Sequence, residues 1–559
     1  MTRTSLWRFL AIGLPALGSL IAPLPAVDLA FQLRAGSDIL RSGAIPTTDP
    51  WTFTVAGAPW LDQQWGAQVL LQLVFGATGW TGLVVLRAAL VALAFGLLLL
   101  VVRRRAPVLP AAAASLLVLA AFVVAAPALA LRPQLFAIDL FAATLLILAA
   151  RGDHPRLVWL IPVIAVAWAN LHGTFLFAPA LCGLAWLADL FDAARSGRGP
   201  APAPDRVSAP GRVSPPVGAA GPGRGSWAGR AGWRSHTMLA VGLASVVATL
   251  VNPFGLGAWG YVANLTSDPT IASRVSEWQP PSPLTATGAV VWLSILAVVV
   301  LAAVRLRRGQ AAAAAAQPRG SMGWIPWPAI LTLLLFGSFA LLSGRGQAWW
   351  PFVAVFVVAP WLAQPQPDGD PTPASLPAPA SSPRPTPPML RRLNLAIAVA
   401  LVLVGAAFLP LWRSSGPAGV PVSALTFAPQ GIAAELRQLT APVARFCDDR
   451  VWNPQPWGSW LELAAPCARY AVDSRIELYP ASVWDAVDVI SGAADGWDQA
   501  LARLGVTIVV TDRSTERGLE GALLASHTWT RVYADCDGSV WKVASGDAVG
   551  IAVPPTDCP

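Results

Sequence analysis

Residues 80–105 read WTGLVVLRAALVALAFGLLLLVVRRR, an apolar run that ends in three arginines. About 20 apolar residues are enough for a helix to cross the hydrocarbon core of a bilayer. Arginines at one end of such a span indicate its cytoplasmic side, because positively charged loops are retained there. This stretch therefore predicts a transmembrane helix, and the charges at its end predict its direction.

The composition of the whole chain is that of a membrane protein. Of its 559 residues, 55% are hydrophobic and 12% are charged, whereas soluble domains carry about 25% charged residues. The net charge of +8 comes mostly from arginines between apolar spans. We therefore expect membrane lipid as a partner. The sequence shows no basic stretch rich in aromatic residues, so we expect no nucleic-acid partner.

Ten further apolar runs have the length of a membrane span. The arginine clusters all fall on one side of the membrane if the chain has eleven spans and a cytoplasmic N-terminus. We expect the first span to be an uncleaved anchor, because it contains no Ala-x-Ala cleavage site followed by a soluble mature sequence. We expect spans near residues 9–27, 80–102, 108–127, 134–150, 157–171, 174–190, 237–252, 285–304, 325–343, 347–363 and 394–412.

Three regions lie outside the spans and their short connections. Residues 196–233 and 364–390 are rich in Pro, Gly and Ala, so we expect disordered cytoplasmic loops. Residues 413–559 alternate helical patterns with β-rich runs, which predicts a small α/β domain outside the cytoplasm. Helices are expected at 429–439 and 495–504, a strand at 506–511, and a hairpin over 529–543.

Four of the five cysteines fall in this C-terminal domain. An even set in a domain outside the cytoplasm indicates disulfides. The simplest pairing joins Cys447 to Cys467 and Cys536 to Cys558. A metal site is disfavoured, because no Cys-x-x-Cys spacing and no nearby histidine cluster occur. The remaining cysteine, Cys182, lies inside a span and reads as a core residue.

Asp28 stands where the first expected span ends, at the start of an external loop over residues 28–65. A carboxylate at that depth is costly unless it has a partner or a function. Residues 29–41 are amphipathic at helical spacing, which predicts a helix in the membrane interface. Asp28 could therefore be a catalytic base or the N-cap of this helix.

Several different short motifs follow one another along the chain. They are Asp28-Leu29, Leu33-Arg34-Ala35-Gly36, Pro46-Thr47-Thr48-Asp49-Pro50-Trp51, Arg132-Pro133-Gln134, Asn170-Leu171-His172-Gly173, Asn252-Pro253-Phe254-Gly255, Glu277-Trp278 and Trp457-Gly458. Together they resemble polytopic bacterial glycosyltransferases of the GT-C fold, in the branch similar to the family 39 protein mannosyltransferases and aminoarabinose transferases. The resemblance implies a cell-envelope enzyme of the plasma membrane.

The resemblance also implies a chemistry. A sugar would move from a polyprenyl-phosphate donor to an acceptor at the outer face of the membrane, with Asp28 as the base. The family's motif has two acids, and the position of the first is Ala26 here. Asp49 is then the candidate for a second catalytic carboxylate, and the resemblance leaves open whether a divalent metal ion takes part.

Four further residues are candidates for substrate binding. Arg132 and Arg345 stand at external span ends, where the positive-inside rule disfavours them, so they could hold the lipid phosphate or reach the headgroups. His172 lies in an external turn and could bind substrate or only the local backbone. Glu277 is either a substrate contact or a solvated loop acid, and Asp473, Arg475 and Glu477 read as a structural ion network.

Two other functions remain open from the sequence. The loss of an acid at Ala26 fits a degenerate GT-C-like protein that binds lipid or assists assembly. A transporter would need polar groups near the membrane midplane, and that hypothesis depends on Asp139 alone.

Overall fold

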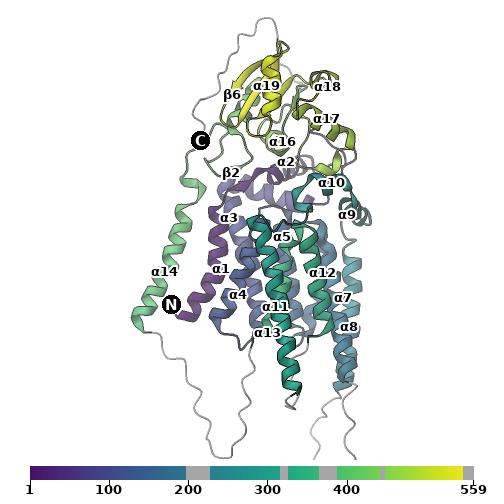
Figure 1. Cartoon of the computed structure of the whole chain (residues 1–559), viewed down its shortest axis with the longest axis vertical. Coiled ribbons are helices and arrows are strands. Elements are labelled where there is room, and N and C mark those ends of the chain that lie inside the picture. Colours follow the sequence, from purple (N-terminus) through teal and green to yellow (C-terminus); the bar gives the residue numbers. More distant parts are fainter. Residues whose placement is uncertain (197–226, 315–324, 364–386, 441–446, 545–559) are drawn as a thin grey trace, which may run out of the picture.

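The computed structural model describes residues 1–196, 227–314, 325–363, 387–440 and 447–544. Upright helices form a bundle, and a small α/β domain covers one end of it (Figure 1), which we call the domain end. Most of the expected disordered loops at 196–233 and 364–390 lies outside the described residues. Helices α8 (Trp227–Ala248) and α14 (Pro388–Ala407) nevertheless begin inside those two ranges, so the expected loops were too long.

The bundle is made of apolar helices at all eleven predicted spans. Within the described residues, seven helices are long and apolar enough to cross a membrane, and four shorter apolar helices match the other spans. The chain is a multi-pass membrane protein. Besides α8 and α14, the helices are α1 (Arg3–Ile21), α3 (Trp65–Arg105), α4 (Ala111–Ala125), α5 (Pro133–Ala150), α6 (Leu160–Ala169), α7 (Phe177–Ser196), α11 (Ala286–Ala314), α12 (Trp327–Leu342) and α13 (Trp350–Leu362).

The first and second spans differ from expectation at their boundaries. Helix α1 ends at Ile21 rather than at residue 27, because Pro23 and Pro25 cannot continue a helix. Helix α3 starts at Trp65, well before the expected span, and is broken at Gly79, whose φ of 61° is left-handed. In the part before Gly79, Gln68 and Gln72 lie against Gly36 of the preceding helix, so α3 has a membrane part and a supporting part.

Helix α2 (Ala26–Ser42) includes the expected interfacial helix but lies between two protein layers. Leu29 and Leu33 pack into the core of the bundle. Ala26 and Ala30 belong instead to the core of the C-terminal domain. The amphipathic pattern correctly predicted a helix. The helix is covered by the C-terminal domain, however, and does not lie only in the membrane interface.

The C-terminal domain is built on a five-stranded sheet of order β4-β3-β5-β7-β6. β4-β3-β5 are parallel and β5-β7-β6 antiparallel. The expected helices, strand and hairpin are confirmed. The elements are β3 (Arg450–Trp452), β4 (Arg469–Tyr470), β5 (Ile508–Asp512), β6 (Trp529–Ala534), β7 (Gly538–Val543), α15 (Gln430–Leu439), α16 (Gln455–Ala464), α17 (Ala481–Ser491), α18 (Trp497–Arg503) and α19 (Arg517–Ala525).

The domain is attached to the bundle by backbone and side-chain contacts. Strand β1 (Leu24–Pro25) pairs in parallel with β2 (Leu425–Thr426). Helix α16 packs on α2. On another side of α16, a Cβ on Gly458 would lie 1.9 Å from the backbone carbonyl oxygen of Val472, so only glycine allows α16 to approach the segment after β4. The Tyr261 hydroxyl on α9 (Gly257–Ser267) donates to Glu477 at 2.9 Å.

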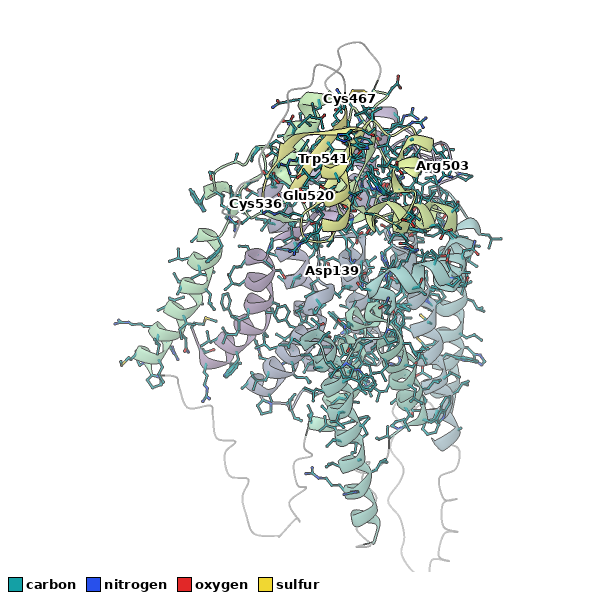
Figure 2. The ribbon with its side chains drawn as sticks, turned by 45° about the horizontal axis from the view of Figure 1, so that its top comes forward. Asp139, Cys467, Arg503, Glu520, Cys536 and Trp541 are labelled. Atoms are coloured by element: carbon teal, nitrogen blue, oxygen red, sulfur yellow. A yellow bond between two sulfur atoms is a disulfide. The ribbon has the colours of Figure 1, made fainter. Side chains whose placement is uncertain are left out.

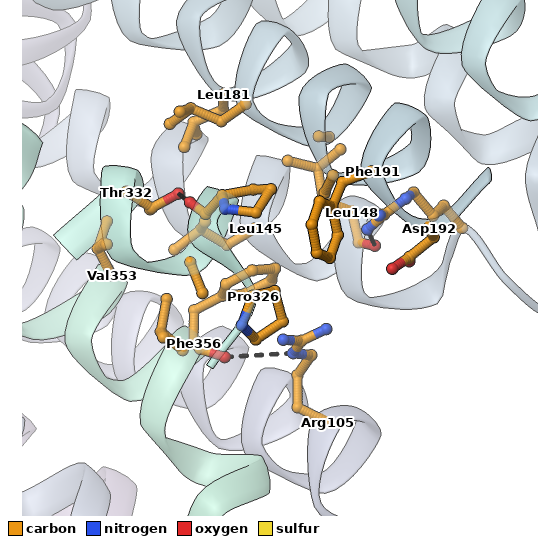
Figure 3. Close-up of a pocket in the computed structure, with 17 residues that line it drawn as sticks. Arg105, Leu145, Leu148, Leu181, Phe191, Asp192, Pro326, Thr332, Val353 and Phe356 are labelled. Atoms are coloured by element: carbon orange, nitrogen blue, oxygen red, sulfur yellow. Dashed lines mark hydrogen bonds between the residues drawn. The ribbon is translucent and has the colours of Figure 1, made fainter. Parts of the chain in front are cut away.

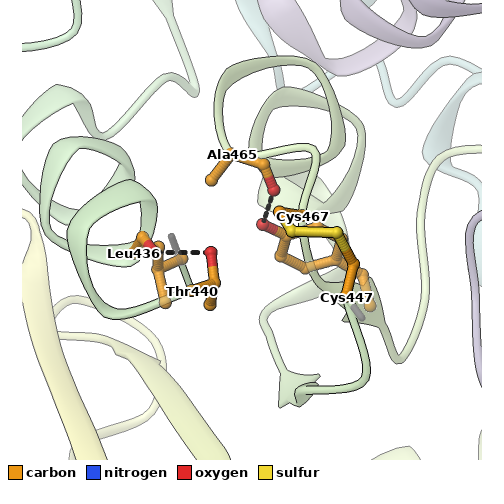
Figure 4. Close-up of a disulfide and its surroundings, with 6 residues drawn as sticks. Leu436, Thr440, Cys447, Ala465 and Cys467 are labelled. Carbon is orange, nitrogen blue, oxygen red and sulfur yellow. Dashed lines mark hydrogen bonds between the residues drawn. A yellow bond between two sulfur atoms is a disulfide. The ribbon is translucent and has the colours of Figure 1, made fainter. Parts of the chain in front are cut away.

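The expected disulfide between Cys447 and Cys467 is formed (Figure 4). It ties the chain before β3 to the turn after α16, next to the Thr440 side chain. Cys536 lies in the turn between β6 and β7, and its expected partner Cys558 lies outside the described residues. Cys182 is a free and buried cysteine, as expected.

Candidate functional site

Arg132 is the centre of a charged cluster at the domain end of the bundle. It is the residue before α5, and Pro133 fixes the helix start directly after it. Its Nη1 donates to Asp28 Oδ2 at 3.0 Å and to Glu277 Oε1 at 2.8 Å. Glu277 also lies 3.6 Å from Arg345. We call Asp28, Arg132, Glu277 and Arg345 the Arg132 cluster.

Asp28 enters the cluster from the third residue of α2. The residue before the helix is Pro25, and it makes no side-chain cap, so Asp28 is not the N-cap that was one of the two expectations. Its carboxylate still lies in the first turn, where a negative charge is favoured by the helix dipole. Oδ1 makes no hydrogen bond to the described residues, and the side chain is 36% exposed. One carboxylate oxygen is therefore free for a ligand.

Glu277 and Arg345 are brought together by two short 3-10 helices, η4 (Ser276–Trp278) and η5 (Gly344–Ala348). The Ser343 hydroxyl donates to the Glu277 carbonyl at 3.1 Å, which joins the two loops. The Arg345 guanidinium lies 4.4 Å from the ring centroid of Trp278. This cation–π contact holds the guanidinium next to Glu277. Trp278 was noted in the sequence only as part of a motif.

The charges in the cluster stabilise one another. Burial raises the pKa of Glu277, but the charge and hydrogen bond of Arg132, with the charge of Arg345, bring that pKa below its ordinary value. Burial likewise lowers the pKa of Arg132, and the two carboxylates raise it above its ordinary value. Arg132 and Arg345 both keep a buried Nε without a hydrogen-bond partner among the described residues. The cluster thus combines an ionised Glu277 with guanidinium groups that have spare donors.

His172 lies beside the cluster and is neutral. Burial first, and then the charges of Arg345 and Arg132, lower its pKa to about 3. Its Nδ1 accepts a hydrogen bond from the Thr174 backbone N–H at 3.2 Å. The neutral ring therefore carries its proton on Nε2, which is the tautomer that donates on that side. The local backbone contact expected for His172 is present, together with proximity to both arginines.

Asp49 belongs to a different cluster, buried between the external loop and the C-terminal domain. Its Oδ1 accepts from Arg475 Nη2 at 2.7 Å, and its Oδ2 accepts from the Thr52 hydroxyl at 2.6 Å. Asp473 also pairs with Arg475. The guanidinium lies 4.3 Å from the centroid of the Trp51 ring. Arg475 is thus part of an ion network, as expected, and this network includes Asp49.

Glu277, rather than Asp49, supplies the second carboxylate bound to the same guanidinium as Asp28. Ala26, where the resemblance expects an acid, is 1% exposed and packed in the C-terminal domain's core. Among the described residues, no group of three His, Cys, Asp or Glu side chains could hold a metal ion. Because Arg132 stands between the two acids, the positive charge between them comes from the protein.

Two features of the bundle lie apart from this cluster. Asp139 on α5 is buried below the C-terminal domain (Figure 2), and neither carboxylate oxygen has a hydrogen-bond partner among the described residues. A cavity of about 230 Å³ opens at the other end of α5, where Leu145, Phe356 and Arg105 line it (Figure 3). Arg105 donates to the Phe356 carbonyl at 3.2 Å.

Comparison with known proteins adds information on the fold. No protein-family model and no curated protein sequence matches this chain. An oligosaccharyltransferase from Archaeoglobus fulgidus, solved in the apo form, has a TM-score of 0.50 at 12% identity, over 97% of this chain and 74% of that chain. The fold is GT-C-like. Oligosaccharyltransferase AglB from the same organism, in complex with an inhibitory peptide and a dolichol-phosphate, has a TM-score of 0.52 at 11% identity, over 90% of this chain and 69% of that chain. Such identities establish the fold and do not select the family 39 branch.

Proposed function

We propose that this protein is a membrane glycosyltransferase that moves a sugar from a polyprenyl-phosphate donor to an acceptor at the outer face of the membrane. The Arg132 cluster is the observation that carries this proposal. It offers a carboxylate oxygen and two guanidinium groups at one end of a GT-C-like bundle, and the neutral His172 lies beside it. One of the matching structures holds a dolichol-phosphate, which supports a lipid-linked donor.

Asp28 is the proposed base. Its free Oδ1 takes the proton from the acceptor hydroxyl as that oxygen attacks the anomeric carbon. The bond from this carbon to the phosphate oxygen breaks, the configuration inverts, and the lipid phosphate leaves as an anion. Arg132 fixes Asp28 through Oδ2, so the other oxygen is the one that can face an acceptor.

Arg345, Arg132 and His172 are the proposed ligands of the leaving phosphate. Guanidinium groups bind phosphate oxygens through paired N–H donors, and the Nε2–H of His172 adds a donor without a charge. Glu277 holds both guanidinium groups in place. Asp49 has a supporting role in this proposal, since its carboxylate is bound by Arg475.

The proposed orientation places the C-terminal domain outside the cytoplasm. The Cys447–Cys467 disulfide supports this side, because disulfides persist in oxidising compartments. The arginine clusters at the ends of predicted spans support a cytoplasmic N-terminus in a bacterial plasma membrane.

The test compares release of polyprenyl phosphate by wild-type protein and by Asp28→Asn. Purified protein is given polyprenyl-phosphate sugars together with short oligosaccharide and peptide acceptors. Loss of the base is expected to lower turnover by about 10²–10⁴-fold. Asp153→Asn is the control, because Asp153 forms an exposed ion pair with Arg104 elsewhere in the bundle.

The degenerate alternative gives a different result. If no donor turns over while polyprenyl phosphate still binds, the protein is a lipid-binding or assembly component, as the replacement of the first acid by Ala26 allows. Unchanged turnover in Asp28→Asn would remove Asp28 as the base.

A further inference from the structure

Residues 473–479 of the C-terminal domain lie against the elements that carry the Arg132 cluster. The Ser474 hydroxyl donates to the backbone carbonyl of Val27 at 2.9 Å, and Val27 directly precedes the proposed base. Three residues further along, the Glu477 carboxyl accepts from the Tyr261 hydroxyl on α9 at 2.9 Å. One short segment of the domain thus connects the start of α2 with α9.

Helix α9 also packs against the turn that carries His172. A Cβ on Gly173, the next residue, would lie 3.3 Å from Cγ2 of Val262, which follows Tyr261 in α9. The charges of both arginines of the Arg132 cluster act on His172. The hydroxyl that binds Glu477 therefore comes from a helix that contacts the immediate surroundings of the cluster.

The charge of Glu477 acts on the cluster as well. Burial lowers the pKa of Arg345, whereas the negative charges of Glu277, Asp28 and Glu477 oppose that shift. Burial and the charge of Glu477 raise the pKa of Tyr261, and the charge of Arg345 lowers it. Two carboxyls from different domains, Asp28 and Glu477, therefore lie around the same guanidinium group.

The Glu477 carboxyl retains capacity for further hydrogen bonds. Besides the Tyr261 hydroxyl and its own backbone N–H, it has no hydrogen-bond partner among the described residues. A carboxylate has about four acceptor positions, so some of them stay unused. Glu477 is partly exposed, as are the side chains of Asp28 and Glu277. An incoming molecule can therefore reach acids from both domains.

These acids narrow the class of acceptor that suits the site. In the proposed reaction the guanidinium groups bind the phosphate of the donor, which leaves carboxyls to meet the acceptor. A serine or threonine side chain offers one hydroxyl, and Asp28 needs that hydroxyl as the attacking group. A sugar residue offers several hydroxyls, each of which can donate a hydrogen bond. One of them can face Asp28 while another donates to Glu477.

We propose that Glu477 is an acceptor-binding residue and that the acceptor is a sugar. The Glu477 carboxyl accepts a hydrogen bond from a second hydroxyl of the sugar whose first hydroxyl faces Asp28, and Tyr261 positions Glu477 for this contact. The C-terminal domain then supplies part of the site in addition to covering it. That the bound sugar receives the transferred group rests on the proposed function, whereas its binding beside Glu477 does not.

The experiment measures sugar binding to the full-length protein in detergent, saturated with polyprenyl phosphate. Neutral disaccharides and trisaccharides of mannose, galactose, glucose and arabinose, and short serine and threonine peptides, are titrated by calorimetry. We expect at least one saccharide to bind and Glu477→Met to weaken its binding about tenfold or more, because a hydrogen bond to a charged group is lost. Glu477→Gln, which keeps one acceptor oxygen, and Tyr261→Phe should have smaller effects. Asp498→Asn is the matched control, because Asp498 is exposed on α18 of the same domain.

Binding of polyprenyl phosphate alone distinguishes a lost sugar contact from a damaged site. Glu477→Met should keep or strengthen this affinity, because it removes a negative charge that acts on Arg345. Arg345→Gln should weaken it. If Glu477→Met loses phosphate binding as well, Glu477 holds the site together instead of binding sugar, and the proposal falls.

The remaining outcomes also decide the proposal. It would be overturned by absence of binding for every neutral saccharide at millimolar concentration, by saccharide binding that Glu477→Met leaves unchanged, or by binding of the peptides that Glu477→Met weakens.

Turnover separates this proposal from the proposed function. If no donor is consumed while sugar binding still depends on Glu477, the proposed function fails and the sugar site stands. If Asp28→Asn abolishes turnover while Glu477→Met leaves the KM for the acceptor unchanged, the proposed function stands and the sugar site fails.

Discussion

Arg475→Met should strongly destabilise the contact between the C-terminal domain and the external loop. Arg475 is 1% exposed and pairs with Asp49 and Asp473, whose side chains are both 0% exposed. Removing one partner from a buried ion pair costs about 3–5 kcal/mol, because the other charge stays buried. Methionine retains part of the packing against the neighbouring rings, so we expect a loss of about 4 kcal/mol.

Urea unfolding followed by tryptophan fluorescence measures this loss in the full-length protein. With a slope of about 2 kcal/mol per M for a small domain, the midpoint should fall by about 2 M. The exposed control Arg503→Met should change stability by less than about 0.5 kcal/mol. In the double variant with Asp49→Asn, the loss should be smaller than the sum of the single losses, because the two residues share one interaction.

A small effect would refute this reasoning. If Arg475→Met lowers stability by less than about 1 kcal/mol, well under the cost expected for an unpaired buried charge, the ion network does not hold the domain on the loop. Additive losses in the double variant would show that Asp49 and Arg475 are not coupled.

Three further predictions concern stability and packing. The pKa of Glu277 in the folded protein is below its ordinary value, so its pairing with Arg132 stabilises the fold fully above about pH 4.5 and is lost as the pH falls through the folded pKa. The difference in thermal unfolding temperature between wild type and Glu277→Gln should therefore shrink below about pH 4.5. A difference that stays constant with pH would contradict this prediction. Replacing Cys447 and Cys467 by serine should lower the free energy of unfolding by about 3 kcal/mol on the chain-entropy model. The urea midpoint should then be lower than that of wild type under non-reducing conditions. An equal midpoint would show that the bridge adds no stability. Gly458→Ala would place a Cβ 1.9 Å from the backbone carbonyl oxygen of Val472, so α16 should be displaced from the segment after β4 and proteolysis of the domain should speed up. Unaltered proteolysis would show that the contact adjusts.

The sequence was informative wherever one physical effect dominated. Apolar runs predicted the positions of eleven apolar helices, of which seven described ones are long enough to cross a membrane, because a helix that crosses the hydrocarbon core needs about 20 apolar residues. The placement of α2 could not be predicted in the same way, because an amphipathic helix fits a lipid surface and a protein surface equally well. Leu29 and Ala30 are neighbours in sequence but face two different cores.

The candidate site was predicted residue by residue but not as an arrangement. Arg132 and Arg345 were selected because of their place at external ends of spans, and Glu277 as an acid in a loop. That Arg132 joins Asp28 to Glu277 depends on the packing of loops 145 residues apart in the chain, which has no local signal. Asp49 was grouped with Asp28 for its motif, whereas the fold binds it to Arg475, 426 residues away.

The pairing of β1 with β2 sets the order in which the molecule can be completed during synthesis. Leu24 pairs with Leu425, so the segment just before Asp28 must wait until about 400 more residues have been made. At about 5–20 residues per second, this delay is roughly 20–80 s. Until then α2 contacts only the bundle and not the C-terminal domain. The helices of the bundle are therefore synthesised before the C-terminal domain can cover the helix that carries Asp28.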